Sequence, residues 1–260
     1  MEYPTALVTG NNRDTRIWSS EKNGASIHVA IIATQPHYTA KVCQDITDSV
    51  RTAGGHRQLI VVTVCPGITV SQLEAWLPKR TPIMRTMPNT PISVKQGATA
   101  IFSNQYMTSS LSAEVQLIFK SISPEVALLP EEDLMDIAAS VSGSAPAYLY
   151  HLVRSLVAAG TARGLPADMT TRLVVQACLG AAKLAQASQD TPMEQLLSDV
   201  CVPGGSTEKA VQALDRHGAS KAVDAAVETS WHANRAMSGD VGPPAHCESD
   251  IGTVKDIVVK

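Results

Sequence analysis

The stretch "SIHVAIIATQPHYTAKVCQDITDSVRTAGGHRQLIVVTV", residues 26–64, carries the strongest signal for the fold class. It opens on the apolar, β-branched run Ser26–Thr34 and closes on a second such run, His56–Val64, as expected of strands buried on both faces. Between them, residues 37–55 carry apolar side chains at helical spacing and stop at a Gly-Gly pair. Strand, helix and strand in this order predict a right-handed parallel crossover, hence an α/β domain.

Downstream, the pattern changes from strand-like to helical. Residues 82–89 (PIMRTMPN) and 97–104 (GATAIFSN) are two further strand-like pieces, separated by a Pro-rich turn. After about Ser123, residues 131–166 and 167–188 show long helical patterns without strand-like alternation. We therefore expect an all-α domain to follow the α/β domain.

The two long helical patterns carry small residues where buried faces are expected. The first bends at residues 142–146 and ends in a Gly-Leu-Pro stop at residues 164–166. The small residues are Ala158, Ala159, Gly160, Ala177, Gly180 and Ala181. Such residues let helices approach closely, within or between subunits, which favours self-association.

Composition excludes several function classes. The 260 residues are 44% hydrophobic and 17% charged, with a net charge of −3 and no basic run, which argues against a nucleic-acid partner. The five cysteines are scattered without a CxxC pair, so neither a metal site nor a disulfide framework is indicated. No membrane-spanning run or signal-peptide layout is present, and we expect a cytoplasmic protein in a reducing compartment.

One turn stands out in the helical half. In "DVCVPGGSTEKAVQAL", residues 199–214, a Pro-Gly-Gly-Ser-Thr turn directly precedes a helical run. Successive backbone N–H groups at a helix N-terminus bind an anion or a carboxylate well. A simpler interpretation is an ordinary helix cap, in which Ser206 or Thr207 caps and the glycines only turn the chain.

Three stretches together resemble pyrroline-5-carboxylate reductase: "MPNTPISVKQGATAIF" (residues 87–102), "VSGSAPAYLYHLVRSLVAAGTARGLP" (141–166) and "DVCVPGGSTEKAVQALD" (199–215). The resemblance spans residues 25–234 and implies hydride transfer from NADPH or NADH to a cyclic imine, which yields proline. It also implies a Rossmann-like dinucleotide-binding domain over residues 1–122, a helical substrate and dimerisation domain over 123–235, and a tail over 236–260. Members of the family assemble as homodimers or larger homo-oligomers, and the partner supplies the Pro-Gly-Gly loop.

The resemblance assigns roles to the Pro-Gly-Gly loop. Gly204, Gly205 and Ser206 are expected to hold the substrate carboxylate, and Thr207 to hydrogen-bond the imine nitrogen as the catalytic residue. The family has Ser before the Pro-Gly-Gly turn, whereas this chain has Val202. Since a lost hydrogen bond to a charged group costs roughly 1.5–3 kcal/mol, weaker or altered carboxylate binding is expected.

The resemblance also assigns cofactor contacts. Asn89 lies where the family places the nicotinamide carboxamide, although a rigid turn between strands would also explain it. The segment "ATQP", Ala33, Thr34, Gln35 and Pro36, resembles a strand end that lies against the cofactor, with Thr34 and Gln35 replacing Val and Lys. Cys65, at the next strand end, is expected to be small packing.

The cofactor half departs from the family pattern. A dinucleotide fold needs a first strand that ends in G-x-G-x-x-G, and this sequence contains no G-x-G. "TALVTGNNRD" resembles the second strand, with Asn12 and Arg13 where the family binds the adenosine phosphate of NADPH. Loss of the first strand is expected to leave neighbouring strands with unpaired edges. We favour an N-terminally incomplete sequence over a degenerate relative.

Two other functions stay open on the sequence alone. A non-catalytic assembly subunit would keep the helical domain without binding a dinucleotide; the missing glycine loop favours it, and Thr207 argues against it. A β-hydroxyacid type of reductase is disfavoured, because its catalytic lysine would fall at Lys183, inside a stretch that matches the imine-reductase pattern.

Overall fold

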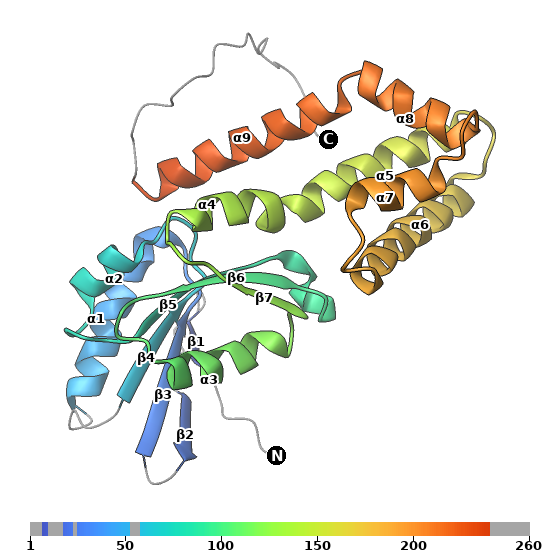
Figure 1. Cartoon of the computed structure of the whole chain (residues 1–260). Coiled ribbons are helices and arrows are strands. Elements are labelled where there is room, and N and C mark those ends of the chain that lie inside the picture. The colour runs from blue at the N-terminus through green and yellow to red at the C-terminus, as the bar shows by residue number, and fades with distance from the viewer. Residues whose placement is uncertain (1–6, 10–17, 23–24, 53–57, 240–260) are drawn as a thin grey trace.

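The computed structural model describes residues 7–9, 18–22, 25–52 and 58–239. An α/β domain is joined to a set of helices that extends to one side (Figure 1). The strands are β1 (Leu7–Thr9), β2 (Trp18–Lys22), β3 (Ala25–Ile32), β4 (Gln58–Thr63), β5 (Ile83–Pro88), β6 (Ala98–Ser103) and β7 (Glu125–Leu128).

The helices of the α/β domain are α1 (Pro36–Thr52), α2 (Val70–Trp76), a short 3₁₀ turn η1 (Thr90–Val94) and α3 (Ser109–Lys120). The second part consists of α4 (Leu134–Ala138), a π-helical turn η2 (Ala139–Gly143), α5 (Ala145–Thr161), α6 (Ala167–Ala187), α7 (Met193–Val200), α8 (Ser206–Arg216) and α9 (Ala219–Met237). We call residues 145–237 the helical arm. The predicted order, α/β first and all-α second, is confirmed.

The sheet has the strand order β1-β3-β4-β5-β6-β7, and β2 pairs with β3 off this path. The pairs β1–β3, β3–β4, β4–β5 and β6–β7 are parallel, whereas β2–β3 and β5–β6 are antiparallel. The parallel crossover predicted from residues 26–64 is thus confirmed as β3-α1-β4. The two later strand-like pieces form β5 and β6, which pair as a hairpin.

The edge of β3 opposite β4 is occupied. Residues Ala30–Ile32 pair with β1, and Ala25–Val29 pair with β2. The expectation of unpaired edges is therefore wrong for β3. The physical reason is that β1 and β2 share this edge, one at the carboxyl end of β3 and the other at its amino end.

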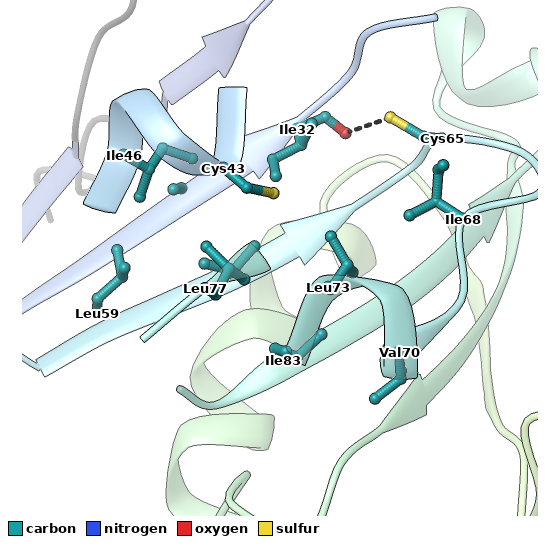
Figure 2. Close-up of a cluster of buried hydrophobic side chains, with 12 residues drawn as sticks. Ile32, Cys43, Ile46, Leu59, Cys65, Ile68, Val70, Leu73, Leu77 and Ile83 are labelled. Atoms are coloured by element: carbon teal, nitrogen blue, oxygen red, sulfur yellow. Dashed lines mark hydrogen bonds between the residues drawn. The ribbon is translucent and has the colours of Figure 1, made fainter. Parts of the chain in front are cut away.

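Helices cover both faces of the sheet because its central strands are apolar on both faces. On one face, α1 and α2 bury Cys43, Ile46 and Leu73 against the strands (Figure 2). On the other, α3 buries Val115 and Phe119. Thr69 and Gln72 form a reciprocal capping box at the start of α2, and Thr108 caps α3. This part of the chain has a closed core of its own.

The sheet continues past the domain boundary suggested after residue 122. Strand β7 pairs in parallel with β6 over four residues, so Glu125–Leu128 belong to the α/β part. The chain then crosses to α4 and bends at the π turn η2, where Ser144 N–H donates to Ala139 C=O over 2.9 Å. The bend expected near residues 142–146 lies at this turn, and we place the boundary between β7 and α4.

The helical arm has almost no core within a single chain. Of its residues, all of which the structure describes, only Pro146 and Thr170 are buried. Along α5, α6 and α7, large apolar side chains stay exposed: Leu149, Tyr150, Leu152, Leu156, Leu173, Val175, Leu179, Leu184, Met193 and Leu197. In the described part of the chain, no helix is both long and apolar enough to cross a membrane. Large exposed apolar patches mark interaction sites, so we expect a second molecule to bury these side chains.

Candidate active site

The carboxyl ends of three parallel strands meet at one edge of the sheet. The loops that follow β3 and β4, and the Pro-rich turn after β5, begin there, because β3–β4 and β4–β5 are parallel and in register. In open α/β sheets, ligands bind outside the carboxyl ends of the strands. This edge is therefore where a nicotinamide cofactor is expected.

Residues 33–36 lie at this edge as the sequence suggests. Ala33 and Thr34 are half-buried, Gln35 is exposed, and Pro36 begins α1. The Thr34 Oγ1 lies 3.3 Å from Thr39 Oγ1 and 3.8 Å from Cys65 Sγ. The first two strand-end loops thus contact each other through short polar side chains.

Cys65 is buried and its thiol is engaged. Its Sγ donates to the Ile32 carbonyl oxygen over 3.4 Å, which ties the end of β4 to the end of β3 (Figure 2). A buried thiol held in this way packs rather than reacts. The geometry fits the packing role expected for Cys65.

Both the oxygen and the nitrogen of the Asn89 side-chain amide form hydrogen bonds. The Ala98 N–H donates to Asn89 Oδ1 over 2.9 Å, and Asn89 Nδ2 donates to the Ser142 carbonyl oxygen over 3.3 Å. The side chain therefore joins the β5–β6 turn to the π turn η2, which links two of the sequence motifs. One amide N–H remains for a further partner. The predicted residues Asn12 and Arg13 lie outside the described residues.

The Pro-Gly-Gly loop forms the N-terminus of α8. Gly204 has φ +75°, and Gly205 is the N-cap without any side-chain cap bond. The alternative in which Ser206 or Thr207 caps the helix is wrong, because the helix already begins at Ser206 and its cap position holds glycine. Glycine at both positions lets the backbone turn without a Cβ in the way.

The loop exposes donors for an anion. Within the described part of the chain, the backbone N–H groups of Ser206, Thr207 and Glu208 have no hydrogen-bond partner, nor has the Thr207 hydroxyl. The Gly204 N–H donates to the Glu208 carboxylate Oε2 over 2.8 Å. A side-chain carboxylate thus already sits on one donor of this loop, as the N-terminal end of the helix dipole favours.

One chain does not bring the two halves of the site together. The loop between α7 and α8 lies at the end of the helical arm that points away from the sheet, whereas residues 33–36 and Asn89 lie at the sheet edge (Figure 1). The structure thus groups five predicted residues in this loop: Val202, Gly204, Gly205, Ser206 and Thr207. It does not bring them near residues 33–36 or Asn89 of the same chain.

Sequence reasoning missed a charged cluster at the junction of the two parts. Arg85, on β5, has a side chain only 6% exposed; it donates to Glu132 Oε1 over 2.9 Å and to Asp136 Oδ1 over 3.2 Å. A small pocket of about 10 Å³, room for about one water molecule, adjoins it and is lined by Cys65, Gly67, Met87 and Asn234 among others. The available signal was a lone arginine in the apolar strand PIMRTMPN.

Comparison with known proteins identifies relatives of this chain. A family model described as pyrroline-5-carboxylate reductase dimerisation matches residues 132–237. A delta-1-pyrroline-5-carboxylate reductase (apf3) of Gibberella fujikuroi is 49% identical over 240 residues, which cover 90% of this chain and 81% of that protein. The reductase of Pseudomonas aeruginosa is 29% identical, over 91% and 84% of the two chains.

Solved structures show the same similarity. The pyrroline-5-carboxylate reductase of Coxiella burnetii superposes with a TM-score of 0.75 at 30% identity, over 81% of this chain and 76% of that one. The pyrroline carboxylate reductase of Plasmodium falciparum, solved with NADP bound, gives a TM-score of 0.71 at 28% identity, over 81% and 77%. With nearly half of its residues identical to a reductase that it covers over most of its length, this chain belongs to the pyrroline-5-carboxylate reductase family.

Proposed function

We propose that this protein reduces 1-pyrroline-5-carboxylate, or a related cyclic imino acid, to L-proline or its analogue, with NADPH or NADH as the hydride donor. Family membership supports the reaction, and the NADP bound to the Plasmodium falciparum reductase supports the cofactor. The relatives described above are all named reductases, which favours catalysis over a non-catalytic assembly role.

The observation that carries the proposal is the Glu208 carboxylate on the Gly204 N–H, 2.8 Å away. It supports a loop that accepts carboxylates, with the backbone N–H groups of Ser206 and Thr207 as further donors. A cyclic imino acid presents one carboxylate next to its ring nitrogen. A carboxylate bound at this helix N-terminus would bring the imine nitrogen within reach of Thr207.

The reaction does not require an ionisable general acid from the protein at the imine nitrogen. When bound, the cofactor supplies a hydride to the imine carbon, and the ring nitrogen ends as an amine with one proton more than the neutral imine. The nitrogen can enter the site already protonated, so the Thr207 hydroxyl needs only to orient it. The loop N–H groups meanwhile hold the carboxylate, and their helix dipole favours its negative charge.

The residues at the sheet edge fit the nicotinamide end of the cofactor. The backbone of residues 33–36 and the Asn89 amide, with its one uncommitted N–H, face the carboxyl ends of the strands. No Gly-rich turn after a strand, of the kind that holds a pyrophosphate, occurs among the residues whose structure is described. The proposal therefore assigns these residues the nicotinamide half only.

Assembly completes the site. The loop of one chain lies far from its own sheet edge, and the helical arm exposes the apolar side chains that a second copy would cover (Figure 1). In the proposed homodimer, or larger homo-oligomer, the partner's loop lies over the cofactor edge of this chain. We place the enzyme in the cytoplasm, since the four cysteines of the described residues are all free thiols.

The test combines cofactor binding with turnover of the full chain. Wild-type protein should bind NADPH in a saturable titration and oxidise it when 1-pyrroline-5-carboxylate is added. Thr207→Ala should lower kcat roughly 100-fold, the usual cost of removing one hydrogen-bond donor to the reacting group, with NADPH binding unchanged.

Thr47→Ala is the matched control. The Thr47 hydroxyl donates to the Cys43 carbonyl oxygen of its own helix, and its loss should leave kcat unchanged. Folded wild-type protein that binds no dinucleotide, or that turns over equally well without the Thr207 hydroxyl, would contradict the proposed function.

A further inference from the structure

Arg85 is the centre of a buried charged cluster that joins β5, the segment around α4 and the start of α2. It lies in β5, where it pairs with Phe102 of β6, and its two terminal nitrogens donate to Glu132 and Asp136. Glu132 lies just before α4, and its Oε1 also accepts the Val70 N–H, at the start of α2, over 2.8 Å. The cluster thus fixes α4 to the sheet and to the N-terminus of α2.

The charges of this cluster are balanced by its surroundings. Two carboxylates face one guanidinium, and each carboxylate has a second donor: the helix N-terminus for Glu132 and the Ser238 hydroxyl, 3.4 Å away, for Asp136. Arginine is suited to this place because its planar fork fixes the direction of both carboxylates, which a lysine would not do.

The end of α9 is held at the same junction. Asn234 Nδ2 donates to the Asp136 carbonyl oxygen over 3.3 Å and to Ser140 Oγ over 3.1 Å. The loop after β4 lies so close to this end that a Cβ on Gly67 would fall 2.6 Å from the Met237 carbonyl oxygen. The C-terminal end of the helical arm is therefore held against α4, the turn η2 and the loop after β4.

The two loops on the cofactor side are connected to this cluster. The loop that leads from β4 into α2 ends at Val70, and Asn89 lies four residues beyond Arg85 on the same strand and turn. The ion pairs that fix Arg85 to Glu132 and Asp136 therefore also fix the cofactor edge of the sheet relative to the helical arm.

We propose that Arg85 is a positioning residue that, through Glu132 and Asp136, sets the angle between the α/β domain and the helical arm. This inference rests on the proposed function, in which the partner's Pro-Gly-Gly loop must lie over the cofactor edge of this chain. Because the arms carry that loop, a change of angle at the junction moves Thr207 of the partner relative to the nicotinamide. A misplacement of about 1 Å costs roughly 100-fold in rate.

Two variants separate positioning from folding. Arg85→Lys keeps the charge and loses the fork. The neutral triple variant, Arg85→Met with Glu132→Gln and Asp136→Asn, removes all three charges and leaves none unpaired, so it is expected to fold. We expect kcat to fall between about 10- and 100-fold in both, with NADPH affinity and the dimer unchanged. Arg51→Met, at an exposed surface pair, is the control and should change nothing.

A second readout does not depend on turnover. Spin labels on ketone-bearing unnatural residues at the exposed positions 95 and 183 report the distance between the sheet edge and the arm, in dimers diluted with unlabelled chain. We expect a narrow distance distribution in the wild-type background and a wider or shifted one in Arg85→Lys and in the triple variant.

The outcomes separate the two proposals. An unchanged distance distribution, or wild-type kcat in a folded triple variant, overturns the role of Arg85 and leaves the reductase intact. A wild-type protein without turnover overturns the proposed function, and the distance measurement still decides whether Arg85 sets the angle. If the triple variant does not fold, Arg85→Lys alone decides by the same two readouts.

Discussion

The α/β domain and the helical arm differ in where their apolar side chains go. In the α/β domain, Ile60, Val62, Leu73 and Met84 are buried within the same chain, on both faces of the sheet. In the arm, the apolar side chains of α5–α7 stay exposed, although these helices are just as regular. Local sequence can thus specify a helix fully while leaving its packing partner in another molecule.

The two regions also differ in what their stability depends on. The α/β domain buries its core within the single chain, whereas the stability of the arm must depend on protein concentration if a second copy covers it. In the proposed enzyme the same division applies to the site: the proposed cofactor edge is built within one chain, and the loop proposed to bind the carboxylate is carried by the part that needs a partner.

The largest expected effect comes from a charge on the arm. Leu173→Glu, on α6, should dissociate the oligomer and abolish turnover, since an unpaired carboxylate in an apolar interface costs several kcal/mol, about 3 or more. Sedimentation velocity at micromolar concentration measures this directly. The matched control is Leu117→Glu on α3: the two leucines are 57% and 66% exposed in the single chain. Equal behaviour of the two variants would contradict the assignment of the arm to an interface.

The next effect concerns the loop that the arm carries. Val202→Ser should lower the KM for the imino acid about 10-fold or more, because a hydrogen bond to a charged group is worth roughly 1.5–3 kcal/mol. Val202 is 67% exposed within one chain, so a lower KM reports contact with substrate rather than repacking. Val200→Ser, at a similarly exposed valine two residues earlier, serves as the control. An unchanged KM in Val202→Ser would argue against carboxylate binding at this position.

A smaller effect distinguishes packing within the arm from packing between copies. A Cβ on Gly160 would lie 2.7 Å from the Thr170 Cγ2 of the same chain, whereas a Cβ on Gly180 meets nothing within 4 Å. Gly160→Val should therefore lower the free energy of unfolding by about 1–3 kcal/mol, and Gly180→Val should change it by about 0.5 kcal/mol or less. Urea titrations measure both. Strong destabilisation by Gly180→Val would show that a second copy occupies that space.

Chemical labelling of the protein's own cysteines perturbs the molecule least, and the labelling rates report how deeply each thiol is buried. Burial, helped by the nearby Cys65, raises the pKa of the Cys43 thiol to about 12, so its reactive thiolate is scarce at pH 8. Iodoacetamide at pH 8 should label the partly exposed Cys201 of the arm much faster than the buried Cys43, as peptide mapping would show. The half-exposed Cys178 should become slower as the oligomer forms. Comparable labelling of Cys43 and Cys201 would contradict the closed core.

The raised pKa of Cys43 also predicts a pH dependence for the α/β domain. Its contribution to stability is fully present below the ordinary thiol pKa of about 8.5 and is lost as the pH rises towards 12, because the unfolded thiol ionises first. Urea titrations at pH 8 and pH 10 should show this loss, and Cys43→Ala should reduce it.

Much of the fold was predictable because its signals are local. The strands β3 to β6 follow from β-branched runs, and α5 and α6 follow from helical periodicity with Gly and Pro stops. The pairing of β1 and β2 with one edge of β3 was not predictable, since pairing joins segments that no local pattern connects. The place of β7 in the sheet was missed for the same reason.

The candidate site was predictable to a similar degree. The Pro-Gly-Gly turn and the strand-end residues are visible as motifs, and glycine, rather than Ser206 or Thr207, occupies the cap. Asn89 has a structural bond on each side of its amide, which its sequence context does not reveal. Arg85 carried only a weak signal, because its two partners are 47 and 51 residues away in the chain.

The order of strands and helices, the Gly-rich turn before α8 and the apolar stripes of the arm could all be read from the sequence, since these depend on neighbouring residues. Folding was needed to show that the turn lies away from the sheet edge of its own chain, that β1 and β2 pair with β3, and that one buried arginine joins the sheet to α4. The physical reason is distance along the chain: helical periodicity, turns and caps are written within a few residues, whereas burial, ion pairing and a shared site depend on segments that only folding brings together.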